Sequence, residues 1–313
     1  MQTSHFHVFG IGQCSLDYIG AVDQYPLPDT KCEFDNLNIV GGGPVATALV
    51  ALSRWGLNCA FAGITGDDDF SNMIRYSLDI EGIDLSGLLV RIGTLSQFAF
   101  ITAERKSGAR TIFWQRPTGT ALLPEEIDMH ILKRCRVLHT DGLFPDASLA
   151  ACIEAKRSGI PVVVDAGTWR EGMSEIARFS DYFIASERCG IALTGSDEPL
   201  DACKRILEFG PRLAAVTIGS RGYVAAHKGK LIRKPAYPVE AIDTTGCGDI
   251  FHAGFIYGLL QQWTIEKGLD LGAWAASRVS LEFGGRAGIP SLMEIRNRFL
   301  DRNKNHPTVN GDQ

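Results

Sequence analysis

The sequence predicts an α/β protein with a doubly wound, mostly parallel β-sheet, the Rossmann-like arrangement in which helices cover both faces. Short apolar segments alternate with longer segments of helical spacing along most of the chain. Several helical segments stop at a glycine, the residue that most often follows a helix. With 313 residues, 45% of them hydrophobic, the chain is long enough for one large α/β domain or two small ones.

The elements follow one another in a strand-then-helix rhythm. Short apolar runs predict strands at residues 8–11, 58–64, 136–140, 160–165, 182–185 and 213–218. Helical spacing between these runs predicts helices at residues 44–55, 70–81, 147–158, 174–179 and 199–209. The strand at 160–165 has the clearest pattern, because a proline is followed by three consecutive valines. Ligands of such open sheets bind at the carboxyl ends of the strands, so we expect the site there.

Two segments, residues 18–40 and 94–114, interrupt this rhythm with strands and turns that lack a crossover helix. Alternation on both sides of a turn at Lys106 to Gly108 predicts a β-hairpin in the second segment. We interpret the two segments as a small β-sheet lid over the active site, although a sheet extension or a dimer surface would give the same pattern. The core then comprises residues 1–17, 41–93 and 115–301, and the polar residues 302–313 form a flexible tail.

Composition excludes several other classes of protein. The formal net charge of −5 argues against a nucleic-acid-binding surface and a polybasic membrane patch. The apolar runs are too short for a transmembrane helix, and the first residues lack the pattern of a secretion signal. The eight cysteines show neither CxxC pairs nor zinc-like spacing, so we expect small buried side chains in a reducing cytoplasm.

The strongest chemical signal is the run Asp-Thr-Thr-Gly-Cys-Gly-Asp at residues 243–249, which leads into an apolar helical stretch. A turn of small residues at a helix N-terminus leaves backbone N–H groups that suit a phosphoryl group, helped by the helix dipole. Gly246, Cys247 and Gly248 are small enough for the backbone to approach a phosphate closely. Asp249 follows in the first helical turn, where a carboxylate either caps the helix or accepts the proton of an attacking hydroxyl. An isolated aspartate near a helix start is usually a cap, so the choice between the two interpretations depends on what the full run resembles.

This run resembles the C-terminal signature of the ribokinase-like (PfkB) carbohydrate kinases, Asp-Thr-x-Gly-Ala-Gly-Asp, with Cys247 replacing the usual alanine or glycine. The resemblance spans roughly residues 8–300, with further motifs in the family's order. It implies a ribokinase-like fold and an enzyme that uses ATP and Mg²⁺ to phosphorylate a hydroxyl of a sugar or sugar-like molecule. Asp249 would be the general base, and residues 246–248 would hold the transferring group.

The same resemblance assigns the substrate side of the site. Gly42 and Gly43 open an apolar helix as in the family's N-terminal signature, whose glycines let the backbone touch sugar hydroxyls. Thr47 stands where the family usually has an asparagine that contacts the substrate. Asp17 fits the sugar-binding aspartate, because one carboxylate can accept two hydroxyl donors. Asp141, after the strand at 136–140, matches an acidic or polar substrate contact, although an aspartate in a turn is the simpler alternative.

The nucleotide side is read from two further segments. Residues 217–222 resemble the family's Thr-x-Gly-x-x-Gly loop, and residues 186–189 stand where the family has Asn-x-x-Glu near a phosphate and magnesium. Serine replaces the asparagine and cysteine the glutamate of the second motif. The ATP-binding residues that follow from the resemblance are Ser186, Glu187, Thr217, Gly219 and Gly222.

Some features resemble the branch of the family that contains sulfofructose kinase. Lys31 fits a basic residue used there on a substrate anion. Trp114 and Gly142 depart from that branch, because an asparagine and an arginine would be expected at these positions. Arg110 or Arg116 would have to supply the missing charge if the substrate is anionic.

Family analogy also implies a monovalent cation, K⁺, near Asp243, Thr245 and Gly284, and a homodimer that pairs through the lid. We considered three rival functions. A dinucleotide-binding oxidoreductase is disfavoured because Ser15 occupies the position of the third glycine in its motif. The others are a non-catalytic sugar-binding homologue and a nucleoside kinase of the same fold, for which the lid aromatics would form a purine slot: Phe98, Phe100, Phe113 and Trp114.

Overall fold

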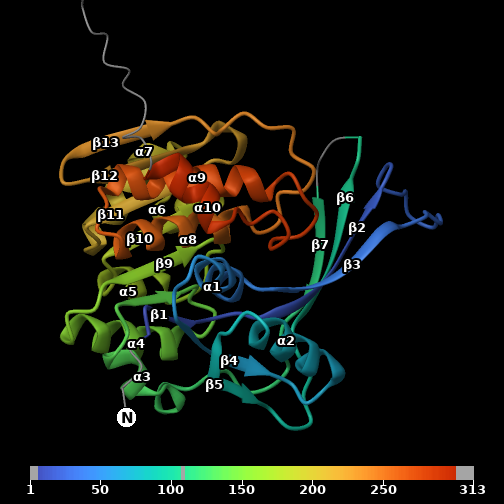
Figure 1. The fold of residues 1–313 in the computed structure, drawn as a ribbon, viewed down its shortest axis with the longest axis horizontal. Coiled ribbons are helices and arrows are strands. Elements are labelled where there is room, and N and C mark those ends of the chain that lie inside the picture. The colour runs from blue at the N-terminus through green and yellow to red at the C-terminus, as the bar shows by residue number, and fades with distance from the viewer. Residues whose placement is uncertain (1–5, 107–109, 301–313) are drawn as a thin grey trace, which may run out of the picture.

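The computed structural model describes residues 6–106 and 110–300, and its architecture is a three-layer α/β/α core with a second, smaller sheet at one side (Figure 1). Nine strands form the central sheet in the order β13-β12-β11-β10-β9-β8-β1-β4-β5. The run from β11 to β5 is parallel throughout, whereas β12 and β13 form an antiparallel hairpin at one edge. This topology confirms the predicted doubly wound, mostly parallel sheet.

The strands are short and apolar, as the sequence predicts for strands buried on both faces. They are β1 (Val8–Ile11), β4 (Cys59–Thr65), β5 (Asp84–Val90), β8 (Val137–Thr140), β9 (Val162–Ala166), β10 (Tyr182–Ser186), β11 (Leu213–Thr217), β12 (Tyr223–His227) and β13 (Lys230–Lys234). Alternate residues enter two separate cores: Val163 packs against one helical layer, and Val162 and Val164 pack against the other.

Helices cover both faces of the sheet. One layer contains α1 (Pro44–Arg54), α2 (Asp69–Asp79), α8 (Cys247–Leu260), α9 (Ile265–Val279) and α10 (Leu292–Phe299). The other contains α3 (Met129–Lys133), α4 (Pro145–Arg157), α5 (Met173–Arg178), α6 (Glu187–Thr194) and α7 (Pro199–Phe209). Two 3₁₀ turns, η1 (Pro124–Glu126) and η2 (Gly219–Arg221), complete the described elements.

Helix α8, which carries Asp249, packs backbone to backbone against α9. A Cβ atom added to Gly254 would lie 2.6 Å from the Cα of Gly272, and one added to Gly258 would lie 2.6 Å from the Cα of Gly268. Most of α8 is buried, including Ile250 at the end of its first turn. The glycine pairs therefore bring the two helix axes close together, and they fix α8 against α9 by backbone contact rather than by adaptable side chains.

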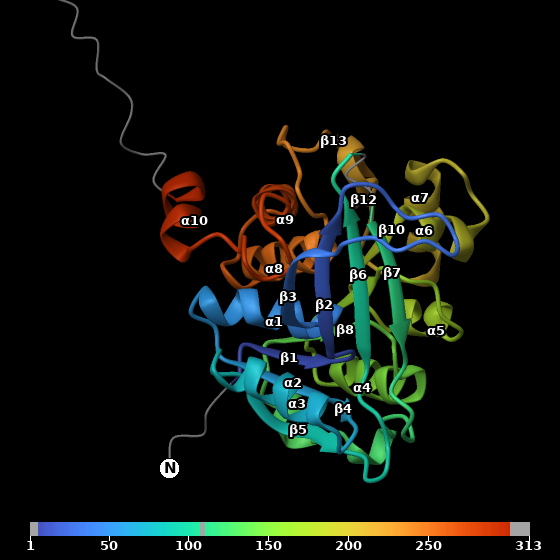
Figure 2. The same ribbon diagram turned by 90° about the vertical axis from the view of Figure 1, so that its right-hand side faces the viewer.

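The second sheet has the strand order β3-β2-β6-β7. Its strands are β2 (Ser15–Val22), β3 (Asp35–Gly42), β6 (Phe98–Glu104) and β7 (Arg110–Gln115). It stands apart from the central sheet, and Figure 2 shows the four strands side by side. The predicted lid segments therefore form one small sheet, whose strands extend a few residues beyond the predicted bounds 18–40 and 94–114.

The predicted elements of the core are found within a few residues of their expected positions, and α7 spans the predicted range. Several elements had no prediction: β5, α3, α6, the β12–β13 hairpin, α9 and α10. β6 and β7 pair antiparallel as predicted, but residues 107 and 108 of the predicted turn lie outside the described residues, as do residues 302–313 of the predicted tail.

All eight cysteines are unpaired, and six of them are buried; Cys32 is exposed and Cys247 half-buried. The six buried cysteines agree with the expectation of small buried side chains, and exposed Cys32 departs from it. Across residues 6–106 and 110–300, the structure contains no helix with the length and apolar character to span a bilayer.

Candidate active site

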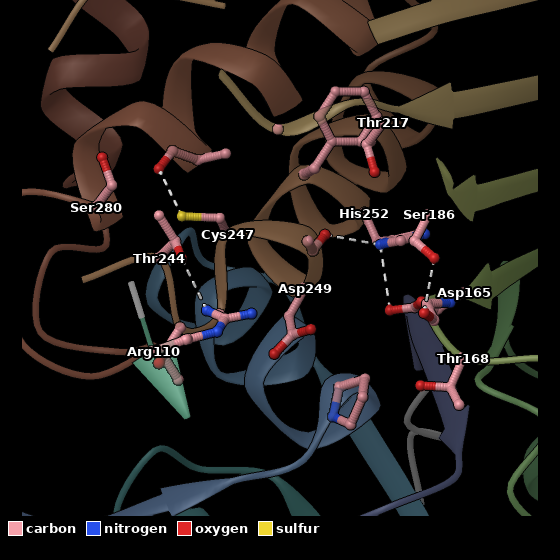
Figure 3. A pocket seen from close by; sticks show the side chains of 18 of the residues that line it. Arg110, Asp165, Thr168, Ser186, Thr217, Thr244, Cys247, Asp249, His252 and Ser280 are labelled. Atoms are coloured by element: carbon pink, nitrogen blue, oxygen red, sulfur yellow. Dashed lines mark hydrogen bonds and ion pairs between the residues drawn. The ribbon is translucent and has the colours of Figure 1, made fainter. Parts of the chain in front are cut away.

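A cavity of about 920 Å³ lies between the carboxyl ends of the central strands and the inner face of the lid sheet. Its floor includes Asp141, Asp165, Ser186 and Thr217, which follow or end the neighbouring strands β8, β9, β10 and β11. The volume falls in the range of small-molecule sites, and the position is the one expected for an open parallel sheet. Figure 3 shows several of the lining side chains.

The start of α8 forms the centre of the floor. Gly246 caps the helix with a left-handed φ of 75°, and a Cβ atom there would lie 2.4 Å from the Cα of Gly285, so glycine is needed on two grounds. The first N–H groups of a helix have no partner within the helix, although that of Cys247 makes a long bond of 3.4 Å to the carbonyl of Thr244. Burial raises the pKa of the Cys247 thiol to about 12, so this side chain stays protonated and is no nucleophile.

Asp249 lies in the first turn of α8 and lines the cavity. Burial, and after it the charge of Asp165, raise the pKa of its carboxyl to about 8, against the opposing charge of Arg110. Figure 3 shows Asp249 between these two residues. A carboxylate with its pKa raised toward neutrality is suited to accept a proton and later release it, which is the requirement for a general base.

A buried histidine connects Asp165 to the first turn of α8. Nδ1 of His252 lies 2.7 Å from the carbonyl oxygen of Gly248 and 3.2 Å from Oδ2 of Asp165. Both partners are acceptors, so Nδ1 carries the hydrogen. Asp165 and His252 are each 3% exposed. The pair therefore fixes the Gly248 peptide, which immediately precedes Asp249, relative to the end of β9.

The lid reaches the same region through Arg110. Its Nη1 donates a 3.1 Å hydrogen bond to Oγ1 of Thr244, in the loop before α8. Strand alternation points Arg110, Ile112 and Trp114 of β7 into the cavity, whereas Phe113 between them faces away and is 54% exposed. The small sheet therefore supplies one cation and an apolar wall opposite the start of α8.

At the end near β1 and β2, Asp17 is 8% exposed and lines the cavity. Oγ of Ser15 donates a 2.7 Å hydrogen bond to its Oδ1. Burial raises the pKa of Asp17 to about 6, and the Ser15 hydrogen bond and the charge of Arg286 oppose this. A Cβ atom on Gly42 would lie 2.0 Å from Oδ2 of Asp17, so the carboxylate can occupy this position only beside a glycine.

Asp141 lies beside this end of the cavity and is 2% exposed. Its carboxylate accepts backbone hydrogen bonds from Gln13 at 2.8 Å and Leu143 at 2.9 Å. Burial raises its pKa, and the charge of Arg170, another lining residue, opposes the shift. Asp141 therefore anchors two loops, and it also lines the cavity. It could hold a turn and contact a substrate at the same time, so the two interpretations from the sequence are compatible.

The opposite end contains the predicted nucleotide residues. Ser186, Thr217, Gly219 and Gly222 all line the cavity. Beyond them, the wall becomes apolar and is formed by Tyr237, Pro238, Val239, Ala241, Phe251, Ala273 and Ala276. Small and apolar side chains on two sides of a slot fit a flat heterocycle such as a purine base.

The predicted cation residues lie together beside the floor. Asp243 is 3% exposed; its Oδ1 accepts hydrogen bonds from the backbone N–H and the hydroxyl of Thr245, and its Oδ2 accepts one from Gly284 at 2.9 Å. The three residues thus meet through the carboxylate of Asp243. Within the described residues there is no cluster of three or more His, Cys, Asp or Glu side chains that could hold a metal ion.

Six predicted site residues do not line the cavity: the cation residues Asp243 and Gly284 described above, and four residues predicted to bind substrate or ATP. Lys31 is exposed in the loop between β2 and β3. Gly42 and Thr47 lie behind the cavity wall, where Thr47 is 2% exposed and accepts a long hydrogen bond from Arg286. Glu187 begins α6 and forms an ion pair of 2.5 Å with Arg221.

Sequence reasoning missed four residues that the fold brings to the site: Gln13, Asp165, Arg170 and His252. Asp165 left a readable signal, because an acidic residue at the carboxyl end of a buried strand points to the ligand-binding edge. The predicted aromatic slot is only partly formed. Trp114 lines the cavity, but Phe98 packs against Phe70 and Phe100 stacks on Phe34.

A doubly wound sheet, a lid and a carboxylate in the first turn of a helix with a small-residue N-terminus define the class of the small-molecule kinases. The family model described as pfkB family carbohydrate kinase matches residues 6–292, and the chain therefore belongs to the pfkB family of carbohydrate kinases. The predicted family, fold and enzyme class are confirmed. The sulfofructose kinase branch stays a prediction.

Individual relatives agree with the family. The chain is 27% identical to a 5-dehydro-2-deoxygluconokinase of Geobacillus kaustophilus, a match that covers 85% of this chain and 86% of the relative. It is 28% identical to an ATP-dependent ribose-1-phosphate kinase of Halopiger xanaduensis, covering 84% and 88% of the two chains. The structure of an Arabidopsis thaliana ribokinase complexed with ribose and ATP has the same fold, with a TM-score of 0.82, 20% identity and coverage of 95% and 99%.

Proposed function

We propose that this carbohydrate kinase transfers the γ-phosphoryl group of ATP to a hydroxyl of a sugar, with Asp249 as the general base. One observation carries the proposal: Asp249 lines a single continuous cavity, between a carboxylate-rich end near Asp17 and an apolar end near Val239. A base in that position lies between a bound polyol and a bound nucleotide. Phosphoryl transfer needs such positioning, charge stabilisation and a proton acceptor.

The sugar would bind at the end that contains Asp17. Carboxylates accept hydrogen bonds from hydroxyl groups, and Asp17 and Asp141 both present carboxylate oxygens there. The backbone of Gly43 also lines this end. Gly42 and Thr47 would act from behind the wall, by leaving room for Asp17 and by holding the turn, rather than by direct contact. Lys31 would reach a substrate only if its loop moves toward the cavity.

ATP would bind with its base against the apolar end and its phosphates toward α8. Thr217, Gly219 and Gly222 would contact the nucleotide, and Ser186 would contact its phosphates. The ion pair with Arg221 makes Glu187 a residue that positions η2 rather than a direct ligand. The named activity of the Halopiger xanaduensis relative and the bound ATP of the Arabidopsis thaliana ribokinase support ATP as the donor.

In the proposed reaction, the sugar hydroxyl donates its proton to Asp249 as its oxygen bonds to the γ-phosphorus and the bond to the ADP oxygen breaks. Backbone N–H groups at residues 246–248 and the guanidinium of Arg110 would stabilise the negative charge on the transferring group. Asp165 offers hard oxygen donors at the cavity, which fit Mg²⁺, an ion held mainly by phosphates and one or two carboxylates. Bound there, Mg²⁺ would neutralise phosphate charge.

A monovalent cation remains part of the proposal. Asp243, Thr245 and Gly284 are brought together beside the phosphoryl-binding turn, and a cation such as K⁺ near Asp243 would stabilise that turn. A K⁺-dependent rate that is lost in a bulky organic cation would support this role, and equal rates in both salts would exclude it.

A homodimer through the lid is also proposed. Several apolar side chains are exposed on the face of the lid that points away from the cavity: Leu37, Ile39, Phe100 and Phe113. An open sheet face with such side chains is suited to pairing with a second copy. We further propose a cytoplasmic enzyme, consistent with its free cysteines.

The test is an ADP-release assay of the purified protein with MgATP and a panel of acceptors: ribose, fructose, fructose 6-phosphate, sulfofructose, ribose 1-phosphate, 5-dehydro-2-deoxygluconate and adenosine. We expect turnover with a sugar that disappears in Asp249→Asn. Turnover with adenosine alone would favour a nucleoside kinase. If sugars bind in thermal-shift experiments but no acceptor is phosphorylated, the chain is a non-catalytic sugar-binding homologue.

A further inference from the structure

Arg286 is a buried cation directly behind the sugar end of the cavity. Its side chain is 8% exposed and does not line the cavity. Within the described residues its guanidinium donates three hydrogen bonds, all to neutral oxygens: Nε to Oγ1 of Thr47 at 3.5 Å, Nη1 to Oγ of Ser77 at 3.3 Å and Nη2 to the carbonyl of Gly42 at 3.4 Å. These distances exceed the usual length of a strong hydrogen bond. A buried charge held so weakly needs a counter-charge.

That counter-charge lies across a turn of glycines. A Cβ atom on Gly41 would lie 2.3 Å from Nη1 of Arg286, and one on Gly42 would lie 2.0 Å from Oδ2 of Asp17. The guanidinium and the carboxylate therefore press against adjacent residues of the same turn. A side chain at Gly41 would displace the guanidinium, and one at Gly42 would displace the carboxylate. The two charged groups can therefore occupy these positions only because both residues are glycines.

The charges of the two groups act on each other. Burial lowers the pKa of Arg286 to about 10, and the charge of Asp17 opposes this more than any other group. Conversely, the charge of Arg286 opposes the rise in the pKa of Asp17 that burial causes. The titratable groups that influence Arg286 are Asp17, Glu81, Arg54 and Cys14, and those that influence Asp17 are Arg286 and Asp243.

The backbone of Arg286 is held independently of this charge. Nη1 of Arg54 donates a 2.7 Å hydrogen bond to the carbonyl of Arg286, and Glu81 fixes Arg54 through two hydrogen bonds of 2.6 and 3.0 Å. Indole Nε1 of Trp55 anchors the same segment by donating to the carbonyl of Pro290. The side chain of Arg286 is thus free to be changed while its segment stays attached to α1.

We propose that Arg286 is a positioning residue for the sugar site, which holds the Gly41–Gly43 turn and keeps the Asp17 carboxylate ionised and oriented toward the substrate. The inference rests on the proposed function in assigning the sugar to Asp17. In this chain Thr47 serves as an acceptor for Arg286 rather than as a substrate contact. Arg286 acts through these neighbours and touches neither substrate.

The first experiment needs no substrate and therefore tests the inference separately from the proposed function. The protein is labelled with ¹³C at the aspartate carboxyls, and Asp17 is titrated by NMR, with Asp17→Asn to assign its signal. We expect Arg286→Met to raise the pKa of Asp17 by about one unit, a tenfold loss of acidity. The control Arg136→Met removes an exposed arginine that donates a hydrogen bond to the carbonyl of Leu260, and should leave Asp17 unchanged. An unshifted Asp17 in folded Arg286→Met overturns the inference.

The second experiment separates positioning from general stability. With the panel sugar that gives the highest turnover, Arg286→Met should raise KM for the sugar about tenfold in assays below about pH 6. In that range a one-unit rise in the pKa of Asp17, which is about 6, leaves about a tenth as much of its carboxylate ionised to accept hydrogen bonds from the sugar. KM for ATP and kcat should stay within about threefold, and the acid limb of kcat/KM should move to higher pH. A fall in kcat with equal rises in both KM values would assign Arg286 a purely structural role.

A conservative variant covers the case in which Arg286→Met does not fold. Arg286→Lys keeps the cation but cannot reach all three acceptors, so we expect a smaller rise in the pKa of Asp17 and a KM for the sugar about threefold above wild type. No change in either quantity would overturn the inference. If no sugar on the panel is phosphorylated, the proposed function fails while the titration still decides the role of Arg286.

Discussion

The two ends of the cavity are built in different ways. The end that we propose for phosphoryl transfer, the phosphoryl end, consists of backbone N–H groups at the start of α8, small residues and the carboxylate of Asp249, with a close backbone contact between Gly246 and Gly285. The end that we propose for the sugar, the sugar end, consists of side chains from β2, the loop after β8 and the lid, with Arg286 behind them. On this proposal, phosphoryl transfer depends on backbone geometry, and the choice of acceptor depends on side chains that can vary.

The largest effect should come from changing Asp249, the side chain that we propose as the general base at the phosphoryl end. Asp249→Asn should lower kcat about a thousandfold, because a general base contributes roughly 10²–10⁴-fold, while KM for the sugar changes little. Steady-state kinetics measure both quantities. Asp146→Asn is the matched control, since Asp146 also lies in the first turn of a helix, α4, but outside the cavity. Turnover near the wild-type value in Asp249→Asn would contradict the assignment.

At the sugar end, replacing the aspartate Asp17 by asparagine should weaken sugar binding rather than lower kcat. Asp17→Asn should raise KM for the sugar about thirtyfold, because hydrogen bonds to a charged acceptor contribute roughly 1.5–3 kcal/mol. KM for ATP should stay near its original value. Isothermal calorimetry with the sugar alone provides a second measurement. Equal losses for the sugar and for ATP would show that the two ends are not separable.

Arg110 belongs to the lid but contacts the phosphoryl end through Thr244. Its substitution therefore tests whether this lid residue acts in phosphoryl transfer or in sugar binding. Arg110→Gln should lower kcat about tenfold, because one charge-assisted hydrogen bond is lost from an exposed position. Arg105→Gln is the control, because Arg105 is a lid arginine paired with Asp23 and Asp35 away from the cavity. A rise in KM for the sugar without a change in kcat would instead assign Arg110 to the substrate.

The smallest expected effect is a shift of a pH profile. The charge of Asp165 raises the pKa of Asp249, so Asp165→Asn should lower that pKa by about half a unit. The base must be deprotonated to act, and activity is lost as pH falls through its pKa. The acid limb of the profile should therefore move to lower pH, even if the maximal rate also falls. An acid limb that stays in place would separate Asp165 from the titration of Asp249.

The same contrast between the two ends explains what the sequence could predict. Residues 243–249 carry a continuous local pattern, so Asp249 and its turn were located without the fold. The parallel core was also readable, because buried strands and amphipathic helices leave local periodicities. The β12–β13 hairpin was missed although Lys228 and Gly229, both with positive φ, form a typical hairpin turn.

Non-local contacts account for the remaining gaps. Arg286 and Thr47 meet across 239 residues, and Arg110 and Thr244 across 134. His252 is an ordinary helical residue until α8 packs over the end of β9. Such partners are set by packing rather than by spacing in the chain, so no local pattern predicts them. Helix α6 escaped notice for a local reason, because Gly190 in its middle weakens the helical signal.

The contact between Gly246 and the turn at residues 284–286 has a consequence for synthesis on the ribosome. Every strand of both sheets precedes, in the chain, the turn that abuts Gly246 and braces the Gly41–Gly43 turn. Contacts of such long sequence separation form late in folding. A nascent chain can therefore build most of its central sheet and its lid before the turn that braces both ends of the cavity has been synthesised.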